Sequence, residues 1–274
     1  MSDASKSLLG KETDYSQGYS PALLFPLDRA LNRQTLSFEQ GLPFHGEDVW
    51  TGYELSWLNL KGKPIVAIAE FRLPADSRCM IESKSFKLYL NGFNHKRFPD
   101  KQSVQATLEA DLSEAAGARV SVRLCSVSDI EEALSDSRGW LCLDDLDVSC
   151  EDFQPNPVLL KIGEEQANEA LCSHLLRSNC PVTGQPDWAS IYIQYSGKQI
   201  EHESLLKYLV SFRQCQDFHE HCVERIFSDL QTKCGCQSLS VYARYTRRGG
   251  LDINPYRATF DLPNKAPVIR TPRQ

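Results

Sequence analysis

A proline-containing acidic segment in the middle of the chain, DDLDVSCEDFQPNPV (144–158), places the strongest limit on the fold. Pro155 and Pro157 lack the backbone N–H that a helix interior or an inner strand requires, so neither element is expected to run through them. Strand-like and helix-like patterns lie on both sides of this segment. We therefore predict two domains, 1–150 and 151–274, which suits a chain of 274 residues.

The first half has the pattern of an α+β domain. Three segments rich in β-branched and aromatic residues predict strands at 64–73, 85–93 and 118–127. Between the last two, KQSVQATLEADLSEAAG (101–117) has helical periodicity and ends on a glycine, a common helix stop.

The second half mixes the same elements without repeating the sequence. Its first helix is expected to end before Pro181, because the residue before a proline avoids the helical conformation. The predicted elements are a helix at 164–178, strands at 189–197 and 238–246, and paired helices at 203–215 and 217–234. Each half is thus predicted to combine antiparallel strands with paired helices.

Composition excludes several classes of protein. A formal net charge of −6 argues against binding a nucleic-acid backbone. The polar start of the chain has no apolar core of a signal peptide, and the apolar stretch PALLFPL is too short to span a bilayer. Ten cysteines in such a long chain are expected to be reduced thiols in the cytosol rather than a disulfide scaffold. A cytoplasmic protein without a membrane segment is predicted.

One cysteine lies in a loop that is unusually well fixed. In RSNCPVTGQPDWAS (177–190), Cys180 stands between an asparagine and a proline, and Asp187 follows seven residues later. Gly184 and two prolines in the same stretch indicate a pinned loop, and a loop residue held this firmly often has a function beyond packing. Cys180 is therefore a candidate nucleophile and Asp187 its candidate proton partner.

The motif DFHEHCVERIF (217–227) has both a structural and a functional interpretation. Asp217 and Glu220 have the spacing of a helix capping box. His219 lies on the helical stripe that carries the apolar residues, so it is either a core histidine or a functional one. A metal site here is not expected, because His219 and His221 lie about 200° apart on a helix and cannot converge on one ion.

Two further motifs carry charge. In ESKSFKLYLNGFN (82–94), interpreted as a strand, Glu82 and Lys84 share a face, which is typical of a solvated strand end or of a binding site. In RYTRRGGLDINPYR (244–257), a group of arginines surrounds a Gly-Gly turn, and arginines on a flexible backbone suit a phosphate. A Rossmann dinucleotide fingerprint is absent from the sequence.

Four of these motifs occur together and in order, namely 82–94, 178–189, 218–220 and the RRGG of 247–250. With the amino-terminal YSPALLFPLDRALNR, they resemble the NADPH-dependent 7-cyano-7-deazaguanine reductases, the nitrile reductases of queuosine biosynthesis. The resemblance covers nearly the whole chain, and the motif order is similar to that of the long, two-module subfamily. It implies two tandem tunnelling-fold (T-fold) modules of α+β class, a homodimer, 7-cyano-7-deazaguanine as substrate, NADPH as cofactor and no metal.

The same resemblance implies roles for individual residues. Cys180 matches the covalent nucleophile, Asp187 the proton donor, and His219 a further catalytic residue that relays a proton. The residues that match the substrate-binding set are Ile81, Glu82, Ser83, Phe218, His219 and Glu220. Those that match the cofactor contacts are Ser83, Lys84, Arg248 and Gly249. Lys84 and Arg248 would then come from different modules.

The implied reaction explains why a cysteine is needed. A thiolate adds to the nitrile and gives a thioimide, which accepts hydride more readily than the nitrile does. If a helix ends at Cys180, as predicted, its C-terminal dipole disfavours the thiolate, and Asp187 must take the proton. Two rival hypotheses stay open: a zinc-dependent T-fold hydrolase acting on a purine or pterin nucleotide, and a non-catalytic module that binds tRNA or a modification enzyme.

Overall fold

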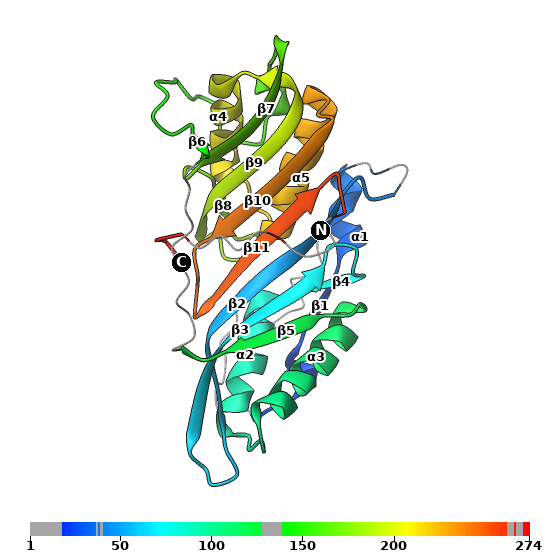
Figure 1. Cartoon of the computed structure of the whole chain (residues 1–274), viewed down its shortest axis with the longest axis vertical. Helices are drawn as coiled ribbons and strands as arrows, with labels where there is room; N and C mark the ends of the chain where they lie inside the picture. The colour runs from blue at the N-terminus through cyan, green and yellow to red at the C-terminus, as the bar shows by residue number, and fades with distance from the viewer. Residues whose placement is uncertain (1–17, 37, 39–40, 128–138, 262–265, 267–270) are drawn as a thin grey trace. The chain divides into compact units, whose positions relative to one another are not determined.

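The structure of the chain, a computed structural model, describes residues 18–36, 38, 41–127, 139–261, 266 and 271–274 (Figure 1). The chain divides into two units that interleave along the sequence. The first unit comprises Met1–Thr35, Asp48–Glu132 and Arg247–Asp252, and the second comprises Leu36–Glu47, Ala133–Thr246 and Ile253–Gln274. These bounds differ from the predicted domains 1–150 and 151–274, because Leu36–Glu47 lies in the second unit and Arg247–Asp252 in the first.

The first unit is built on neighbouring strands in the order β5-β3-β2 and on a separate antiparallel pair, β1 with β4. Its elements are β1 (Pro26–Asp28), β2 (His45–Leu58), β3 (Pro64–Pro74), β4 (Cys79–Ile81), β5 (Ser121–Cys125), α1 (Arg29–Arg33), α2 (Ser83–Asn91) and α3 (Lys101–Ala116). Short 3₁₀ turns lie at Pro21–Leu23, Gln34–Leu36 and Gly92–His95.

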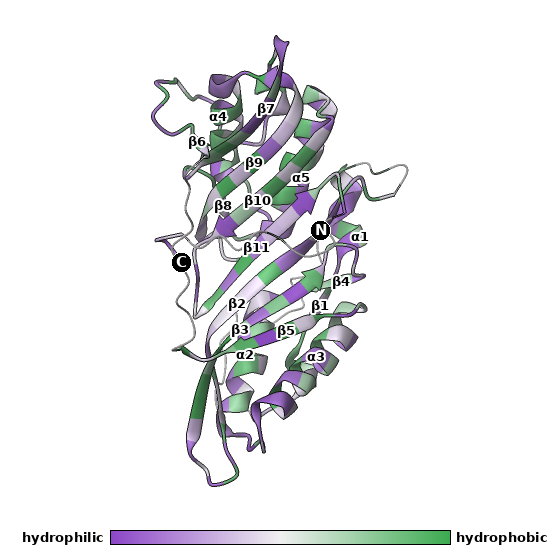
Figure 2. Cartoon of the chain, viewed as in Figure 1, coloured by the Kyte–Doolittle hydropathy of each residue, from purple (hydrophilic) through white to green (hydrophobic). Residues whose placement is uncertain are grey.

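Helix α3 shows how the sequence sets these elements. Every fourth residue on one face, from Val104 through Leu108 and Leu112 to Ala116, is fully buried, as in an amphipathic helix on a core. Figure 2 shows this mixture of apolar and polar residues along α3. The helix ends at Gly117, whose φ of +66° is the left-handed conformation that glycine adopts without a Cβ clash. The predicted helix 101–117 is confirmed.

The second unit contains strands in the order β11-β10-β9-β7-β6, with β8 paired to β9. The β10–β11, β9–β10, β7–β9 and β8–β9 pairs are antiparallel, and β6–β7 is parallel. The elements are β6 (Leu141–Cys142), β7 (Ile162–Ser173), β8 (Arg177–Asn179), β9 (Pro186–Ile200), β10 (Ser238–Tyr245), β11 (Leu251–Ala258), α4 (His202–Ser211) and α5 (His219–Cys234). Two 3₁₀ turns lie at Pro157–Leu159 and Phe212–Gln214.

The strands of the second unit have one face against its helices. Along β10, Leu239, Val241, Ala243 and Tyr245 are fully buried, and α5 contacts this strand. Figure 1 shows α4 and α5 on the same side of β9 and β10. Because side chains alternate between faces along a strand, the even-numbered residues of β9 and β10 point away from these helices.

The predicted strand at 85–93 is wrong, because most of this segment is helix α2. Its Phe86, Leu88 and Leu90 alternate as in a strand, but Phe86, Tyr89 and Phe93 also follow the helical spacing, and these three rings are fully buried. Phe86 packs against Trp50 of β2 and Phe71 of β3, with ring centroids 5.2 and 5.0 Å apart. Packing of the aromatic stripe therefore decides for the helix.

The predicted helix at 164–178 is also wrong, because the segment forms part of β7 and then β8. Its glutamates, alanines and leucines favour a helix in isolation. However, β7 pairs with β9 continuously from Gln166 opposite Lys198 to Ser173 opposite Ile191. This pairing outweighs the local preference, which is weak for any single segment. The strands at 64–73, 189–197 and 238–246 and the paired helices of the second half are confirmed, and β5 lies within the predicted 118–127.

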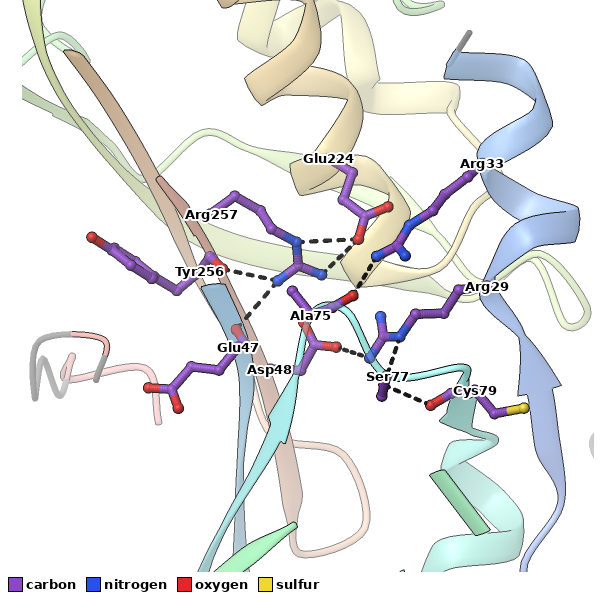
Figure 3. A network of polar contacts seen from close by, with 10 residues as sticks. All are labelled: Arg29, Arg33, Glu47, Asp48, Ala75, Ser77, Cys79, Glu224, Tyr256 and Arg257. Atoms are coloured by element: carbon purple, nitrogen blue, oxygen red, sulfur yellow. Dashed lines mark hydrogen bonds and ion pairs between the residues drawn. The ribbon is translucent and has the colours of Figure 1, made fainter. Parts of the chain in front are cut away.

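Each unit buries an ion pair (Figure 3). In the first, Arg29 Nη2 lies 2.5 Å from Asp48 Oδ2, and its Nε donates to Ser77 Oγ. In the second, Arg257 Nε and Nη2 both donate to Glu224 Oε1, at 3.1 and 2.7 Å. Buried charges need such partners, since each charge left alone would carry a large desolvation cost.

Among the described helices, none is both long and apolar enough to cross a membrane.

Candidate functional site

The loop that carries Cys180 is the turn between β8 and β9. The Cys180 N–H donates to the carbonyl of Gln185 at 2.9 Å, and the Gly184 N–H donates back to the Cys180 carbonyl at 3.0 Å. Gly184 has a φ of +67°, a conformation in which a side chain would be strained. Cys180 is 8% exposed. The prediction of a pinned loop is confirmed, and the loop holds a nearly buried thiol.

Strand pairing positions Asp187 close to this loop. Asp187 lies opposite Ser178 in the β8–β9 ladder, and Cys180 follows that ladder directly. The Asp187 carboxylate is 4% exposed, and its Oδ2 lies 3.3 Å from Nε2 of His219. The structure therefore brings together Asp187 and His219, which the sequence separates by 32 residues.

His219 is held by stacking. Its ring lies on the ring of Tyr245, with centroids 3.7 Å apart and planes 2° from parallel. Burial raises the pKa of Tyr245 well above its ordinary value, so this ring stays neutral. His219 Nδ1 is buried and has no hydrogen-bond partner among the described residues. A buried nitrogen of this kind usually has a partner, and a bound molecule could supply one here.

The start of α5 differs from the predicted capping box. The N-cap residue is Phe218 rather than Asp217, and its side chain makes no capping hydrogen bond. Asp217 instead accepts from the Phe218 N–H at 2.8 Å and contacts His221 Nδ1. Glu220, 4% exposed, lies in the first turn of the helix. His219 and His221 thus contact different carboxylates, as expected for two histidines that cannot share an ion.

A strand rather than a helix precedes Cys180, because β8 ends at Asn179. The expectation that a helix C-terminal dipole disfavours the Cys180 thiolate is therefore wrong. The error follows directly from the incorrect helix at 164–178. A proton acceptor is still required, since an ordinary thiol is mostly protonated near neutral pH.

In the first unit, Glu82 is the N-cap of α2. Its carboxylate accepts from the N–H groups of Lys84 at 2.7 Å and Ser85 at 2.8 Å, and it is 1% exposed. The adjoining Ile81 is buried in β4, while Ser83 and Lys84 form the partly exposed first turn of the helix. The earlier assignment of Glu82 and Lys84 to one face of a strand is wrong for this reason.

Arg248 and Gly249 belong to the turn between β10 and β11. The Arg248 N–H donates to the Leu251 carbonyl at 2.9 Å, and Gly249 and Gly250 have φ of +56° and +71°. Two consecutive positive φ values are typical of a tight hairpin turn that glycine allows. The φ of Gly250 is strained for a residue with a side chain, and a Cβ there would lie 2.3 Å from the carboxyl carbon of Glu54, which would have to move away.

A polar cavity of about 210 Å³ lies beside this turn, within the first unit. Lys87, Leu90 and Asn91 of α2 and Asn94 of the 3₁₀ turn that follows line it, spaced as on successive helical turns. The other lining residues are Gly52, Glu54, Leu55, Gly249, Gly250 and Leu251. Sequence reasoning missed Lys87, Asn91 and Asn94, because their common face exists only when α2 and the 3₁₀ turn after it are helical.

The arginines predicted to cluster around the Gly-Gly turn do not act together. Arg244 is buried, where it donates to Gln274 and Tyr242, and Arg257 pairs with Glu224. Arg247 lies over the ring of Tyr53 at 4.6 Å. Arg248 and Lys84 lie in the same unit, so the expectation that they come from different modules is not met.

Comparison with known proteins gives a consistent result. The family described as "Nitrile reductase, 7-cyano-7-deazaguanine-reductase N-term" matches residues 15–124, and the family "QueF-like protein" matches 186–263. A NADPH-dependent 7-cyano-7-deazaguanine reductase of Chromohalobacter salexigens is 55% identical, over 94% of this chain and 95% of its own. Its namesake from Hydrogenovibrio crunogenus is also 55% identical (95% and 94% covered), and that of Bordetella pertussis is 50% identical (98% and 99%).

Proposed function

Because this chain belongs to the family of NADPH-dependent 7-cyano-7-deazaguanine reductases, we propose that it reduces the nitrile of 7-cyano-7-deazaguanine to the aminomethyl group, in queuosine biosynthesis. The observation that carries the proposal is the Asp187–His219 pair, 3.3 Å apart, next to the turn that holds the buried Cys180. A thiol, a carboxylate and an imidazole gathered in this way can form a covalent bond and move protons.

Cys180 is the nucleophile in this proposal. Its sulfur adds to the nitrile carbon, and the nitrile nitrogen gains a proton, which gives a thioimide bound to the protein. After the first reduction, the resulting thiohemiaminal expels the Cys180 thiolate and leaves an imine, which the second reduction converts to the amine. The buried position of Cys180 protects these species, since an imine in open water would hydrolyse.

Asp187 and His219 manage the protons. Asp187 takes the proton from Cys180 and delivers it to the nitrile nitrogen, a role that contributes about 10²- to 10⁴-fold in comparable enzymes. Stacking on Tyr245 fixes the imidazole of His219, and its buried Nδ1 is available to a bound substrate. His219 thus serves both to relay a proton and to position the base.

Substrate binding is assigned to Ile81, Glu82, Ser83, Phe218, His219 and Glu220. Ionised carboxylates only accept hydrogen bonds, and the guanine-like edge of the base offers N–H donors. Each oxygen of Glu82 already accepts one helix N–H but keeps a further lone pair. Phe218 is partly exposed at the start of α5, where its ring can cover a flat base.

The cofactor contacts are assigned to Ser83, Lys84, Arg248 and Gly249. The cavity beside the Gly249–Gly250 turn supports the cofactor assignment, because Gly249 and Lys87 both line this cavity. A Cβ on Gly249 would lie 3.4 Å from Lys87 Cδ and would narrow the cavity. Lys84, Lys87 and Arg248 give the first unit the positive charge that phosphates require. At about 210 Å³ the cavity suits one end of a dinucleotide rather than the whole. NADPH, when bound, supplies the hydride for each of the two reductions.

The fold is assigned to the T-fold class, with two tandem modules in a homodimer. The family matches at 15–124 and 186–263 fall on either side of the predicted boundary at residue 150, which supports the proposed modules 1–150 and 151–274, with Leu36–Glu47 and Arg247–Asp252 exchanged across that boundary in the structural units. Both units also have the expected α+β composition with antiparallel strands. A cytoplasmic location and the absence of nucleic-acid binding stay predictions.

The test is NADPH oxidation by the purified chain on addition of 7-cyano-7-deazaguanine, with the aminomethyl product identified by mass. Without NADPH, the wild-type protein is expected to form a covalent adduct that Cys180→Ala cannot form. Cys150→Ser, which changes a cysteine of the connecting segment, is the matched control and should form the adduct normally. Turnover by Cys180→Ala would contradict covalent catalysis, and no NADPH oxidation by the wild type would contradict the proposed function.

A further inference from the structure

Three side chains that the proposed reaction does not use converge in the second unit. Cys142 of β6, Cys172 of β7 and His174 just after β7 offer two sulfurs and an imidazole nitrogen, all within 4.8 Å of one another. The parallel β6–β7 pairing sets Cys142 opposite Cys172. His174 follows two residues later and so points to the same side as Cys172.

This cluster lies on the other face of the strands from the candidate active site. Cys172 pairs with Tyr192, and the next position on that face of β9 is Ser190. Even-numbered residues of β9 point away from α5, whereas Asp187 contacts His219 of α5. The triad is therefore separate from the Cys180 chemistry.

Neighbouring groups fix the imidazole of His174. Its Nδ1 lies 2.8 Å from the hydroxyl of Ser190, which is 1% exposed. Its backbone N–H donates to Asp144 Oδ2 at 2.9 Å, and the same carboxylate accepts from the Ser173 hydroxyl at 2.6 Å. In metal sites the ligating histidine is usually oriented in this way, by a hydrogen bond on its other ring nitrogen.

We propose that Cys142, Cys172 and His174 bind a thiophilic metal ion of the Zn²⁺ class. Two thiolates and one imidazole are the donors that Zn²⁺ prefers, with bonds of about 2.3 Å to sulfur and about 2.0–2.1 Å to nitrogen. Donor atoms in a tetrahedral site of that size lie about 3.5–3.8 Å apart. Small side-chain rotations would therefore bring the three donor atoms, now within 4.8 Å of one another, to these distances. Cys142 is exposed, which leaves the fourth position open to water.

The third donor distinguishes this site from a disulfide. A Cys142–Cys172 bond would need only the two neighbouring strands, and it would not account for the imidazole fixed by Ser190 beside them. A bound ion would connect β6, which has only two residues, to the long strand β7. The site would thus fasten the segment that follows residue 139 to the sheet of the second unit.

The experiment uses the full-length chain, reduced, stripped with a chelator and then titrated with Zn²⁺ or with Co²⁺ as a spectroscopic probe. We expect one zinc per chain, thiolate-to-cobalt charge-transfer bands, and a higher thermal unfolding midpoint when the metal is present. Cys142→Ser should lose at least about tenfold in affinity, and its exposed position makes misfolding no obstacle. His174→Gln should behave similarly, and Ser190→Ala should weaken binding less.

Cys150→Ser is the control and should bind zinc like the wild type. Nitrile reduction should be equal in wild type and Cys142→Ser, which separates this site from the proposed active site. Three results would overturn the proposal. The first two are no stoichiometric zinc in the wild type and an equal zinc content in Cys142→Ser. The third is a mass of the unreduced wild-type chain that is two hydrogens below that of the reduced chain, which would show a disulfide instead.

Discussion

The N-terminal ends of α2 and α5 carry the two glutamates assigned to the substrate, Glu82 and Glu220, yet the two ends are built differently. At α2, the Glu82 carboxylate caps its own helix by accepting from Lys84 and Ser85. At α5, the N-cap is Phe218, whose side chain gives no capping bond. One helix start is thus satisfied by its own side chain, and the other is not.

The difference indicates whether the residues that stabilise a helix in each unit are also the residues assigned to the reaction. In the first unit the same carboxylate serves the helix and, in our proposal, the substrate, so a change there affects both. In the second unit the reactive groups Asp187 and His219 contact each other, and neither is the N-cap of a helix. Changes there should therefore affect the reaction with little effect on folding.

Asp187→Asn is expected to give the largest effect. A neutral amide cannot accept the Cys180 proton, so turnover and adduct formation should both fall by about 10²- to 10⁴-fold, with an unchanged free energy of unfolding at neutral pH. Asp229→Asn, in the helix that carries His219, is the control and should react normally. A normal adduct rate in Asp187→Asn would make this residue a structural part of the loop.

Arg248→Ala should reduce the affinity for NADPH by about tenfold to a hundredfold, because one charge-assisted hydrogen bond contributes about 1.5–3 kcal/mol. Adduct formation at Cys180 precedes hydride transfer and should be unaffected. Arg247→Ala, which removes the neighbouring arginine from the Tyr53 ring, should change the affinity less. A smaller loss for NADH than for NADPH would indicate contact with the 2′-phosphate, and no loss for either would remove Arg248 from the site.

Glu82→Ala should destabilise the protein by about 1 kcal/mol, since two N–H groups of α2 lose their acceptor. Glu82→Gln keeps one side-chain oxygen and should lose less stability, while its amide should still weaken binding of the base. Urea unfolding and substrate titration of both variants separate the two effects. Equal stability of Glu82→Ala and wild type would show that the cap does not matter, and the comparison between the two helices would fail.

The smallest expected effects are changes in how the free energy of unfolding depends on pH in the acidic range. Burial alone would raise the pKa of Glu70, but the hydrogen bond and charge of Arg72 outweigh it and lower this pKa below its ordinary value of 4.5. Glu70 therefore adds stability at neutral pH that is lost as the pH falls through its folded-state pKa. For Asp229, burial outweighs the Tyr208 hydrogen bond and raises the pKa above 3.8, so the folded state takes up its proton first and gains stability as the pH falls.

Glu70→Gln should accordingly destabilise the protein at neutral pH, and this loss of stability should shrink as the pH falls through the folded-state pKa of Glu70. Asp229→Asn should be neutral or slightly stabilising at neutral pH. Urea unfolding at a series of pH values measures both. An unchanged pH dependence in Glu70→Gln would show that Arg72 does not lower its pKa.

The residues that the sequence predicts best are those fixed by local rules. The Cys180 turn follows from its prolines and Gly184, and α3 from its periodicity and Gly117. The segment 85–93 satisfies both a strand and a helix pattern, and only packing of Phe86 decides between them. Local rules fail where a segment fits the patterns of a helix and of a strand equally well.

Long-range pairing accounts for the remaining errors. The helical composition of 164–178 is overridden by its ladder with β9. The contact of His219 with Asp187 and its stacking on Tyr245 join three elements that no motif connects. Lys87, Asn91 and Asn94 could have been found from helical spacing alone, had Glu82 been recognised as a cap; glutamate is not among the residues that usually signal one.

The interleaving of the units also bears on synthesis by the ribosome. Most of the first unit has been made by Glu132, but it needs Arg247–Asp252, roughly 120 residues later, to be complete. At about 5–20 residues per second, this delay is roughly 6–24 s. Once residue 180 has been added, the nascent chain contains Cys180 but still lacks the Gly249–Gly250 wall of the cavity. A chain released early, near residue 246, would thus carry the nucleophile without the wall assigned to the cofactor.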